Sequence, residues 1–136
     1  MKTNRWIGLG LSLGLLSTGL ACGDNAIAPK PKAGSVTVSL TTPNADDGAV
    51  LVALFGPGFA NVRPSSASYR LYSLTASPTE IRILVVGDLS TGALLSLDID
   101  DPARIAEYHG TVIQAASRDD IVHTVSTDYD LTFAAR

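Results

Sequence analysis

Residues 49–55 read AVLVALF, an uninterrupted apolar run that ends at the turn sequence Gly56-Pro57-Gly58. A run of this length between turn residues is typical of a central strand that is buried on both faces. Just before it, residues 35–40 read SVTVSL, in which hydroxyl and apolar residues alternate. This period of two predicts a half-buried strand. The centre of the chain is therefore expected to be a β-sheet.

Further strands are predicted along the chain at intervals typical of an all-β domain. Asp101 followed by Pro102 is the one helical signal, with the aspartate as N-cap and the proline at the first helical position. We therefore expect residues 34–136 to form an antiparallel β-sandwich of about seven strands with one short helical turn, in which residues 87–92 make a hairpin-like connection. The five further strands are predicted at residues 69–72, 81–86, 93–99, 111–116 and 129–134.

The first 21 residues have the pattern of a signal peptide. Lys2 and Arg5 give a positive start, residues 6–20 are mostly apolar, and small residues precede Cys22. The apolar run is about fifteen residues long, whereas a helix that crosses a bilayer needs about twenty. We therefore expect an exported protein rather than one with a permanent transmembrane helix.

Cys22 is the only cysteine, so no disulfide can form within the chain. Residues 19–22 read Gly-Leu-Ala-Cys, and a lone cysteine at the end of a signal sequence resembles the lipobox of bacterial lipoproteins. In that family the thiol is alkylated with diacylglycerol and the signal is cut just before the cysteine. The resemblance implies a signal peptide at residues 1–21 and a lipidated residue, Cys22, at the start of a linker over residues 22–33. The alternative is cleavage by ordinary signal peptidase, for which Gly19-x-Ala21 would also serve.

The resemblance also implies a location in the cell envelope. Several acyl chains, such as palmitate, give stable membrane anchoring where a single chain is marginal. Gly23 follows the cysteine in place of the aspartate that retains many lipoproteins at the inner membrane, which favours the outer membrane in a host that has one. Residues 24–33 contain two prolines and two lysines and are expected to be an extended spacer. Without lipidation the protein would simply be secreted.

The charge of the chain argues against one class of partner. From Cys22 onward there are eight basic and thirteen acidic residues, a formal net charge of −5. A nucleic-acid-binding protein needs a basic face that neutralises phosphates. We therefore expect that the protein does not bind nucleic acid. The expected partner of the domain is an envelope protein or a glycan.

Neither histidine lies in a motif for catalysis or metal binding. His109 precedes Gly110 at a predicted turn, and His123 falls in a polar stretch, so both are expected to be solvent-exposed. No serine lies in a Gly-x-Ser-x-Gly elbow, and the spacing of the histidines is not that of a zinc site. We expect no catalytic residue, no cofactor and no metal ligand, and hence no enzyme.

The acidic clusters leave two alternatives open. Asp98 and Asp100 lie on one face of a predicted strand, and with residues 46–47 or 119–120 at a neighbouring end of the sandwich they could bind calcium. The same carboxylates could serve a small envelope hydrolase. Because none of these clusters has the spacing of a dedicated calcium site, we expect a solvated strand end and a helix cap.

The order of the predicted strands weakly resembles cohesin-type sandwiches. It is carried by residues 48–55, the Tyr-Arg-Leu-Tyr of residues 69–72, residues 81–86 and the Gly-Ala-Leu-Leu-Ser-Leu of residues 92–97. The resemblance implies an architecture and no binding residue. Tyr69 and Tyr72 are expected on opposite faces of their strand, so they cannot form one aromatic platform. The functional expectation is a lipid-anchored envelope protein with a binding or structural module, with the hydrolase and calcium-stabilised adhesion as alternatives.

Overall fold

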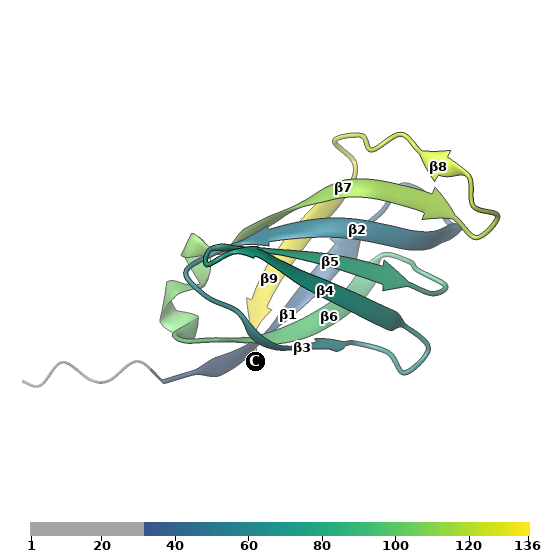
Figure 1. Ribbon diagram of the computed structural model, residues 1–136. Helices are drawn as coiled ribbons and strands as arrows, with labels where there is room; N and C mark the ends of the chain where they lie inside the picture. The colour runs from purple at the N-terminus through teal and green to yellow at the C-terminus, as the bar shows by residue number, and fades with distance from the viewer. Residues whose placement is uncertain (1–31) are drawn as a thin grey trace, which may run out of the picture.

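A computed structural model describes residues 32–136, in which two antiparallel sheets pack face to face (Figure 1). The first sheet has the strand order β3-β6-β1-β9, and the second has the order β4-β5-β2-β7-β8. The predicted all-β antiparallel sandwich is confirmed. The elements are β1 (Gly34–Thr41), β2 (Asp47–Phe55), β3 (Ala60–Pro64), β4 (Arg70–Ser77), β5 (Glu80–Val86), β6 (Gly92–Ile99), the 3₁₀-helix η1 (Pro102–Glu107), β7 (His109–Ser117), β8 (Val122–His123) and β9 (Asp130–Ala135).

The described residues contain nine strands, two more than the sequence predicts. The additional strands are β3 and β8. The sequence of β3 reads ANVRP, which has neither alternation nor an apolar run, and β8 is only two residues long. Such short edge strands form because a neighbouring strand offers free backbone groups, and their own side chains carry no signal for them.

The connection between β5 and β6 was predicted as hairpin-like, and this is wrong. The two strands belong to different sheets, so residues 87–91 cross from one sheet to the other. Leu89 explains the crossing because its side chain is completely buried, while its backbone N–H donates to the carbonyl of Asp47 at 2.9 Å. The segment therefore turns into the core instead of folding back beside β5.

The core lies between the two sheets and consists of aliphatic side chains at alternate positions. The period of two that the sequence shows over residues 35–40 is borne out, because Val36, Val38 and Leu40 are all buried. Burying a side chain of this size contributes roughly 1.5–3 kcal/mol. The other strands supply Val50, Val52, Leu54, Ile81, Ile83, Val85, Leu94, Leu95, Leu97 and Ile99.

Strand β2 is central, as predicted, but only one of its faces is fully buried. Val50, Val52 and Leu54 point into the core, whereas Leu51 is half-buried on the outer face of the five-stranded sheet. The outer face carries apolar side chains such as Leu51 and Leu84 beside the polar Arg82 and Gln114, and no second layer covers it within residues 32–136. The prediction of burial on both faces is therefore wrong for β2.

The predicted helical turn is confirmed as η1. The carboxylate of Asp101 accepts a hydrogen bond from the backbone N–H of Ala103 at 3.0 Å, and Pro102 begins the helix. This helix packs closely on the start of β1, since a Cβ atom added to Gly34 would lie 2.3 Å from Cγ of Pro102. Among residues 32–136, no helix is long and apolar enough to span a membrane.

Candidate functional site

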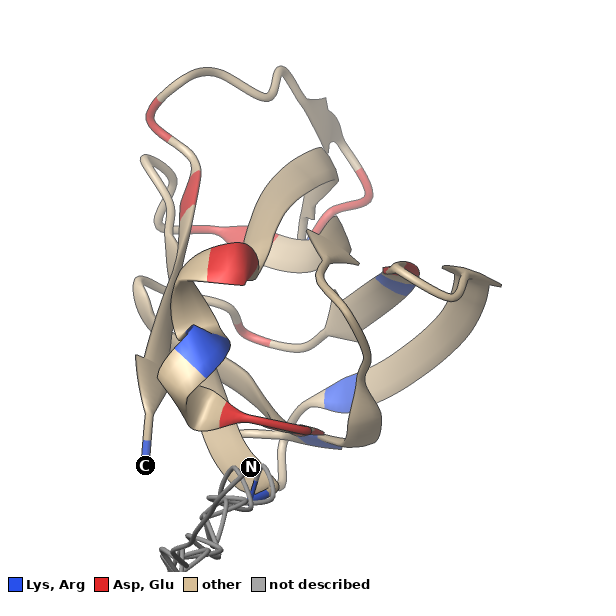
Figure 2. Cartoon of the chain, turned by 90° about the vertical axis from the view of Figure 1, so that its left-hand side faces the viewer, with Lys and Arg blue, Asp and Glu red and all other residues tan. Residues whose placement is uncertain are grey.

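The sandwich has two distinct ends. The entry end holds the start of β1, η1 and the C-terminal residue Arg136, whose backbone N–H donates to the carbonyl of Ser35 at 3.0 Å. The loop end lies at the other end of β1 and comprises the loops at residues 42–46, 87–91, 118–121 and 124–129. Strand β1 has eight residues, so about 26 Å separates the two ends. Figure 2 looks onto the entry end, where both signs of charge lie on η1.

The loop end is organised by Asp47, which is completely buried at the start of β2. Its carboxylate accepts hydrogen bonds from the hydroxyl of Thr42 and from the phenol of Tyr129, the latter at 3.0 and 3.2 Å. The third neighbour is His123, whose Nδ1 lies 2.8 Å from Oδ1 of Asp47. A buried carboxylate is tolerated only when hydrogen bonds replace its water shell, and these three contacts do so.

His123 is held in one orientation by the carboxylates around it. An ionised carboxylate can only accept, so with Asp47 ionised Nδ1 carries the proton and donates to it, and the amide nitrogen of Asn44, which lies 3.1 Å from Nδ1, then donates to Tyr129 and not to the ring. The other ring nitrogen, Nε2, faces Asp46, with 3.8 Å between Nε2 and Oδ1 of Asp46. The side chain of His123 is only 18% exposed, so the prediction that it is solvent-exposed is wrong.

Tyr129 and Asn44 complete the network. The side-chain amide of Asn44 donates to the phenol oxygen of Tyr129 at 2.7 Å, and the phenol donates to Asp47. Burial raises the pKa of Tyr129 above its ordinary value, and the neighbouring charge of Asp47 adds to this shift. The phenol therefore stays protonated at neutral pH and remains a donor to the carboxylate.

The Asp47–His123 pair resembles the orienting half of a catalytic triad, but it has no nucleophile. A triad needs a hydroxyl or thiol in hydrogen-bond reach of the free ring nitrogen. Among residues 32–136, no hydroxyl or thiol forms a hydrogen bond with Nε2, whose ion-pair neighbour is the carboxylate of Asp46. Acyl-transfer chemistry of the triad type therefore lacks its attacking group here.

Asp46, Asp47 and His123 also form a possible metal-binding group, with one ligand atom from each lying within 4.8 Å of the others. Asp47 already accepts from three donors, which leaves the carboxylate of Asp46 and Nε2 of His123 to meet an ion. A structural zinc site uses four protein ligands, and a calcium site uses six to eight oxygen atoms. The donor set is therefore smaller than that of a dedicated site for either metal.

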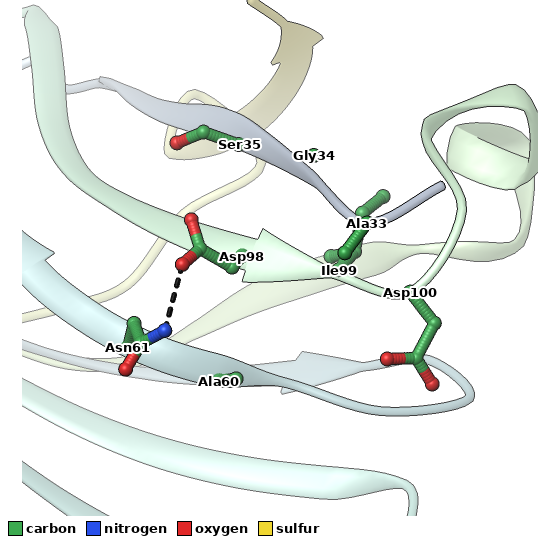
Figure 3. Close-up of a pocket in the computed structure, with 8 residues that line it drawn as sticks. All are labelled: Ala33, Gly34, Ser35, Ala60, Asn61, Asp98, Ile99 and Asp100. Carbon is green, nitrogen blue, oxygen red and sulfur yellow. Dashed lines mark hydrogen bonds between the residues drawn. The ribbon is translucent and has the colours of Figure 1, made fainter. Parts of the chain in front are cut away.

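A second polar site is a hollow at the entry end, with a volume of about 380 Å³ (Figure 3). Asp98 of β6 lies on one of its walls and accepts a hydrogen bond from the side-chain amide of Asn61 at 2.8 Å. Asp100 also lines the hollow, and its carboxylate points away from Asp98 (Figure 3). Asn61 adopts a φ of +48°, which asparagine tolerates better than most residues.

Asp98 is not poised to act as a general acid. The hydrogen bond from Asn61, together with the guanidinium of Arg63 at 3.3 Å, holds the pKa of Asp98 below its ordinary value. A glycosidase acid needs a raised pKa so that it keeps its proton at neutral pH. Asp98 and Asp100 therefore both line the hollow. Asp98, however, is ionised at neutral pH, whereas an acid catalyst must be protonated.

The acidic residues that the sequence placed in one possible calcium site lie at opposite ends of the sandwich. Asp98 and Asp100 are at the entry end, beside β1 and the loop before β3. The pairs at residues 46–47 and 119–120 are at the loop end, where the N–H of Arg118 donates to the carbonyl of Asp46 at 2.9 Å. A calcium site that combines the two groups is therefore excluded.

The other aromatic residues considered as candidates for a functional site pack within the fold or stand apart from one another. His109 is exposed, as predicted, and stacks on Phe55 with 5.1 Å between ring centroids. Tyr69 packs against the core and Tyr72 is 59% exposed, so the two do not form one platform. The residues that the sequence did not single out are Thr42 and Tyr129 as partners of Asp47, and Asn44 as a partner of Tyr129. Tyr129 gave no signal because 82 residues separate it from Asp47 along the chain.

The chain matches no known family model, and no curated protein or solved structure shows significant similarity to it. The class that the structure defines is therefore an all-β, two-sheet antiparallel sandwich. The predicted lipidation residue Cys22 and the predicted signal peptide lie outside the described residues.

Proposed function

We propose that this protein is a lipid-anchored component of a bacterial cell envelope that presents a small β-sandwich as a binding or structural module. The observation that carries the proposal is Cys22, a lone cysteine that directly follows a charged, apolar and small-residue segment. Acylation at this thiol would fix the chain to a membrane through its N-terminal side.

The direction in which the chain enters the sandwich supports the proposal. The first strand begins at Gly34 beside η1, so a spacer over residues 22–33 would meet the domain at the entry end. The loop end would then face away from the membrane. Its exposed aspartates at positions 88, 119 and 120 suit a partner with basic or neutral polar groups, such as an envelope protein or a glycan.

The anchor is tested by expressing the full-length chain in a bacterial host beside the Cys22→Ser variant. We expect the mass of the wild-type protein to equal residues 22–136 plus acyl chains, and the protein to enter the detergent phase on partition. The variant should carry no acyl mass and stay in the aqueous phase. Equal processed masses and two aqueous proteins would show instead a secreted domain released by ordinary signal peptidase.

The contact surface is tested separately by placing a photo-crosslinking residue at Asp119, in the loop end, or at Arg104, in η1. We expect crosslinked envelope components at position 119 and none at position 104. Adducts confined to position 104 would move the contact surface to the entry end.

The hydrolase alternative receives less support from the site. The pair at the loop end lacks a nucleophile, and Asp98 is held in its ionised form by Asn61 and Arg63. We therefore propose a module without enzymatic activity.

A further inference from the structure

The imidazole of His123 has one ring nitrogen that is already engaged and one that is not. Nδ1 donates to the buried carboxylate of Asp47 at 2.8 Å. Among residues 32–136, no hydrogen bond joins Nε2 to another side chain, and the carboxylate of Asp46 lies near it, with 3.8 Å between Nε2 and Oδ1. Because the proton of the neutral ring is on Nδ1, Nε2 carries a free lone pair.

Nε2 and the carboxylate of Asp46 are therefore two electron-pair donors placed side by side. An ionised carboxylate accepts hydrogen bonds and donates none, and the same holds for an unprotonated ring nitrogen. The 3.8 Å between the two atoms is also longer than a hydrogen bond. The two groups thus have no direct bond to each other, and a cation bound by both would satisfy them.

We propose that Nε2 of His123 and the carboxylate of Asp46 bind a divalent transition-metal ion of the Zn²⁺ class, with water molecules as the remaining ligands. Zinc binds imidazole nitrogen and carboxylate oxygen at about 2.1 Å, so two such ligands in tetrahedral geometry lie about 3.4 Å apart. The observed separation is 3.8 Å, and the side chain of Asp46 is 56% exposed. A small rotation of this exposed side chain brings its oxygen to the ligand distance.

Asp47 has a positioning role in this site. A metal-binding histidine usually donates its other ring N–H to a carboxylate or a carbonyl, which fixes the tautomer and the orientation of the ring. Asp47 accepts this hydrogen bond from a completely buried position, where Thr42 and Tyr129 also donate to its carboxylate. The side chain of His123 is only 18% exposed, so the ring is held in place before a metal ion arrives.

The chemistry of the two ligands selects the class of ion. Imidazole suits zinc, copper and nickel, whereas calcium and magnesium are bound by oxygen atoms. Asp46 supplies at most two oxygen atoms, so we do not expect calcium to bind here. The ion would link the loop before β2 to β8, because Asp46 and His123 belong to these two segments. Metal binding is therefore expected to stabilise the loop end, and it does not depend on the lipid anchor.

Calorimetric titration with Zn²⁺ tests the site in the full-length chain carrying Cys22→Ser, because the thiol of Cys22 would itself bind zinc. We expect His123→Gln to weaken binding by at least about tenfold, since losing a ligand costs no less than losing a group that orients one. The glutamine keeps an amide that can donate to Asp47. Asp46→Asn should also weaken binding, because it removes the negative charge that faces the ion.

The matched controls are His109→Gln and Asp119→Asn. His109 is the other of the two histidines in the chain and is exposed, and Asp119 is an exposed aspartate of the loop end. We expect both variants to bind Zn²⁺ as tightly as the Cys22→Ser parent, and circular dichroism confirms that each variant is folded. Unchanged affinity in His123→Gln, or a loss of the same size in His109→Gln, would overturn the proposal.

A second test needs no substitution in the domain. In NMR spectra of the Cys22→Ser parent, we expect the ring resonances of His123 to move at Zn²⁺ concentrations that leave those of His109 unchanged. Zn²⁺ should also raise the melting temperature by mass action, and Ca²⁺ should not. Equal movement of both histidines, no zinc binding at millimolar concentration, or equal stabilisation by Ca²⁺ would overturn the proposal.

Discussion

The carboxylate of Asp47 has no solvent exposure and lies 2.8 Å from Nδ1 of His123. This contact joins the start of β2 to β8, and it ties the β7–β8 and β8–β9 loops to the sandwich. Removing Asp47 takes away the carboxylate that the hydroxyl of Thr42, the phenol of Tyr129 and the imidazole of His123 share. We expect Asp47→Ala to lower the free energy of unfolding by about 3 kcal/mol in urea denaturation.

The control for this prediction is Asp119→Ala, because Asp119 is an exposed residue of the same end of the sandwich. We expect it to change the unfolding free energy by less than about 0.5 kcal/mol. Equal stability losses in the two variants would mean that the buried network does not stabilise the fold.

Tyr129→Phe isolates one member of the network. The phenol donates to Asp47 at 3.0 Å and accepts from Asn44 at 2.7 Å, so its removal breaks two hydrogen bonds inside the protein. We expect a loss of about 1–2 kcal/mol of unfolding free energy. Tyr72→Phe, which removes a hydroxyl from an exposed residue, should leave the midpoint of urea denaturation unchanged. A shift of the same size for Tyr72→Phe would contradict this assignment.

The lowered pKa of Asp98 predicts how its contribution to stability depends on pH. Its folded-state pKa is lowered, chiefly by the amide of Asn61 and then by Arg63. The stabilisation from this group is therefore complete above the unfolded pKa of about 3.9 and is lost as the pH falls through the lower folded value. Asn61→Gly removes the amide but tolerates the φ of +48°. We expect an NMR titration of the Asp98 carboxyl carbon to give a higher pKa in this variant than in the wild type.

The control variant, Asn44→Gly, removes an amide at the loop end and should leave the titration of Asp98 unchanged. An unaltered Asp98 titration in Asn61→Gly would show that Arg63 alone accounts for the shift.

A substitution at Gly48 tests how closely β2 approaches the end of β7. A Cβ atom there would lie 2.7 Å from Cα and 2.9 Å from N of Arg118, which are backbone atoms that cannot rotate away. We expect Gly48→Ala to cost about 1–3 kcal/mol of stability. At Gly58 the nearest atom to an added Cβ is Oδ2 of Asp100 at 3.6 Å, an ordinary contact. Gly58→Ala should therefore melt within a degree or two of the wild type, and a large loss there would contradict the expected difference.

The sequence alone determined the fold class, because the alternation of apolar residues sets which side of each strand is buried. This reasoning located seven of the nine described strands and the helical turn capped by Asp101. The predicted lipidation of Cys22 also comes from the sequence alone, because the signal-peptide pattern depends on the order of residue types along the chain and needs no tertiary contact.

The tertiary structure decided the position of Asp47. Val50, Val52 and Leu54 face the core, so strict alternation would point Asp47 outward. A bulge between Asp47 and Ala49 in the pairing of β2 with β7 reverses this and turns the carboxylate inward. Two of its partners, His123 and Tyr129, then come from 76 and 82 residues further along the chain, and the third, Thr42, lies five residues before it. A bulge depends on how two strands align, and that alignment is fixed by the packing of the whole sandwich and not by the residues around position 47.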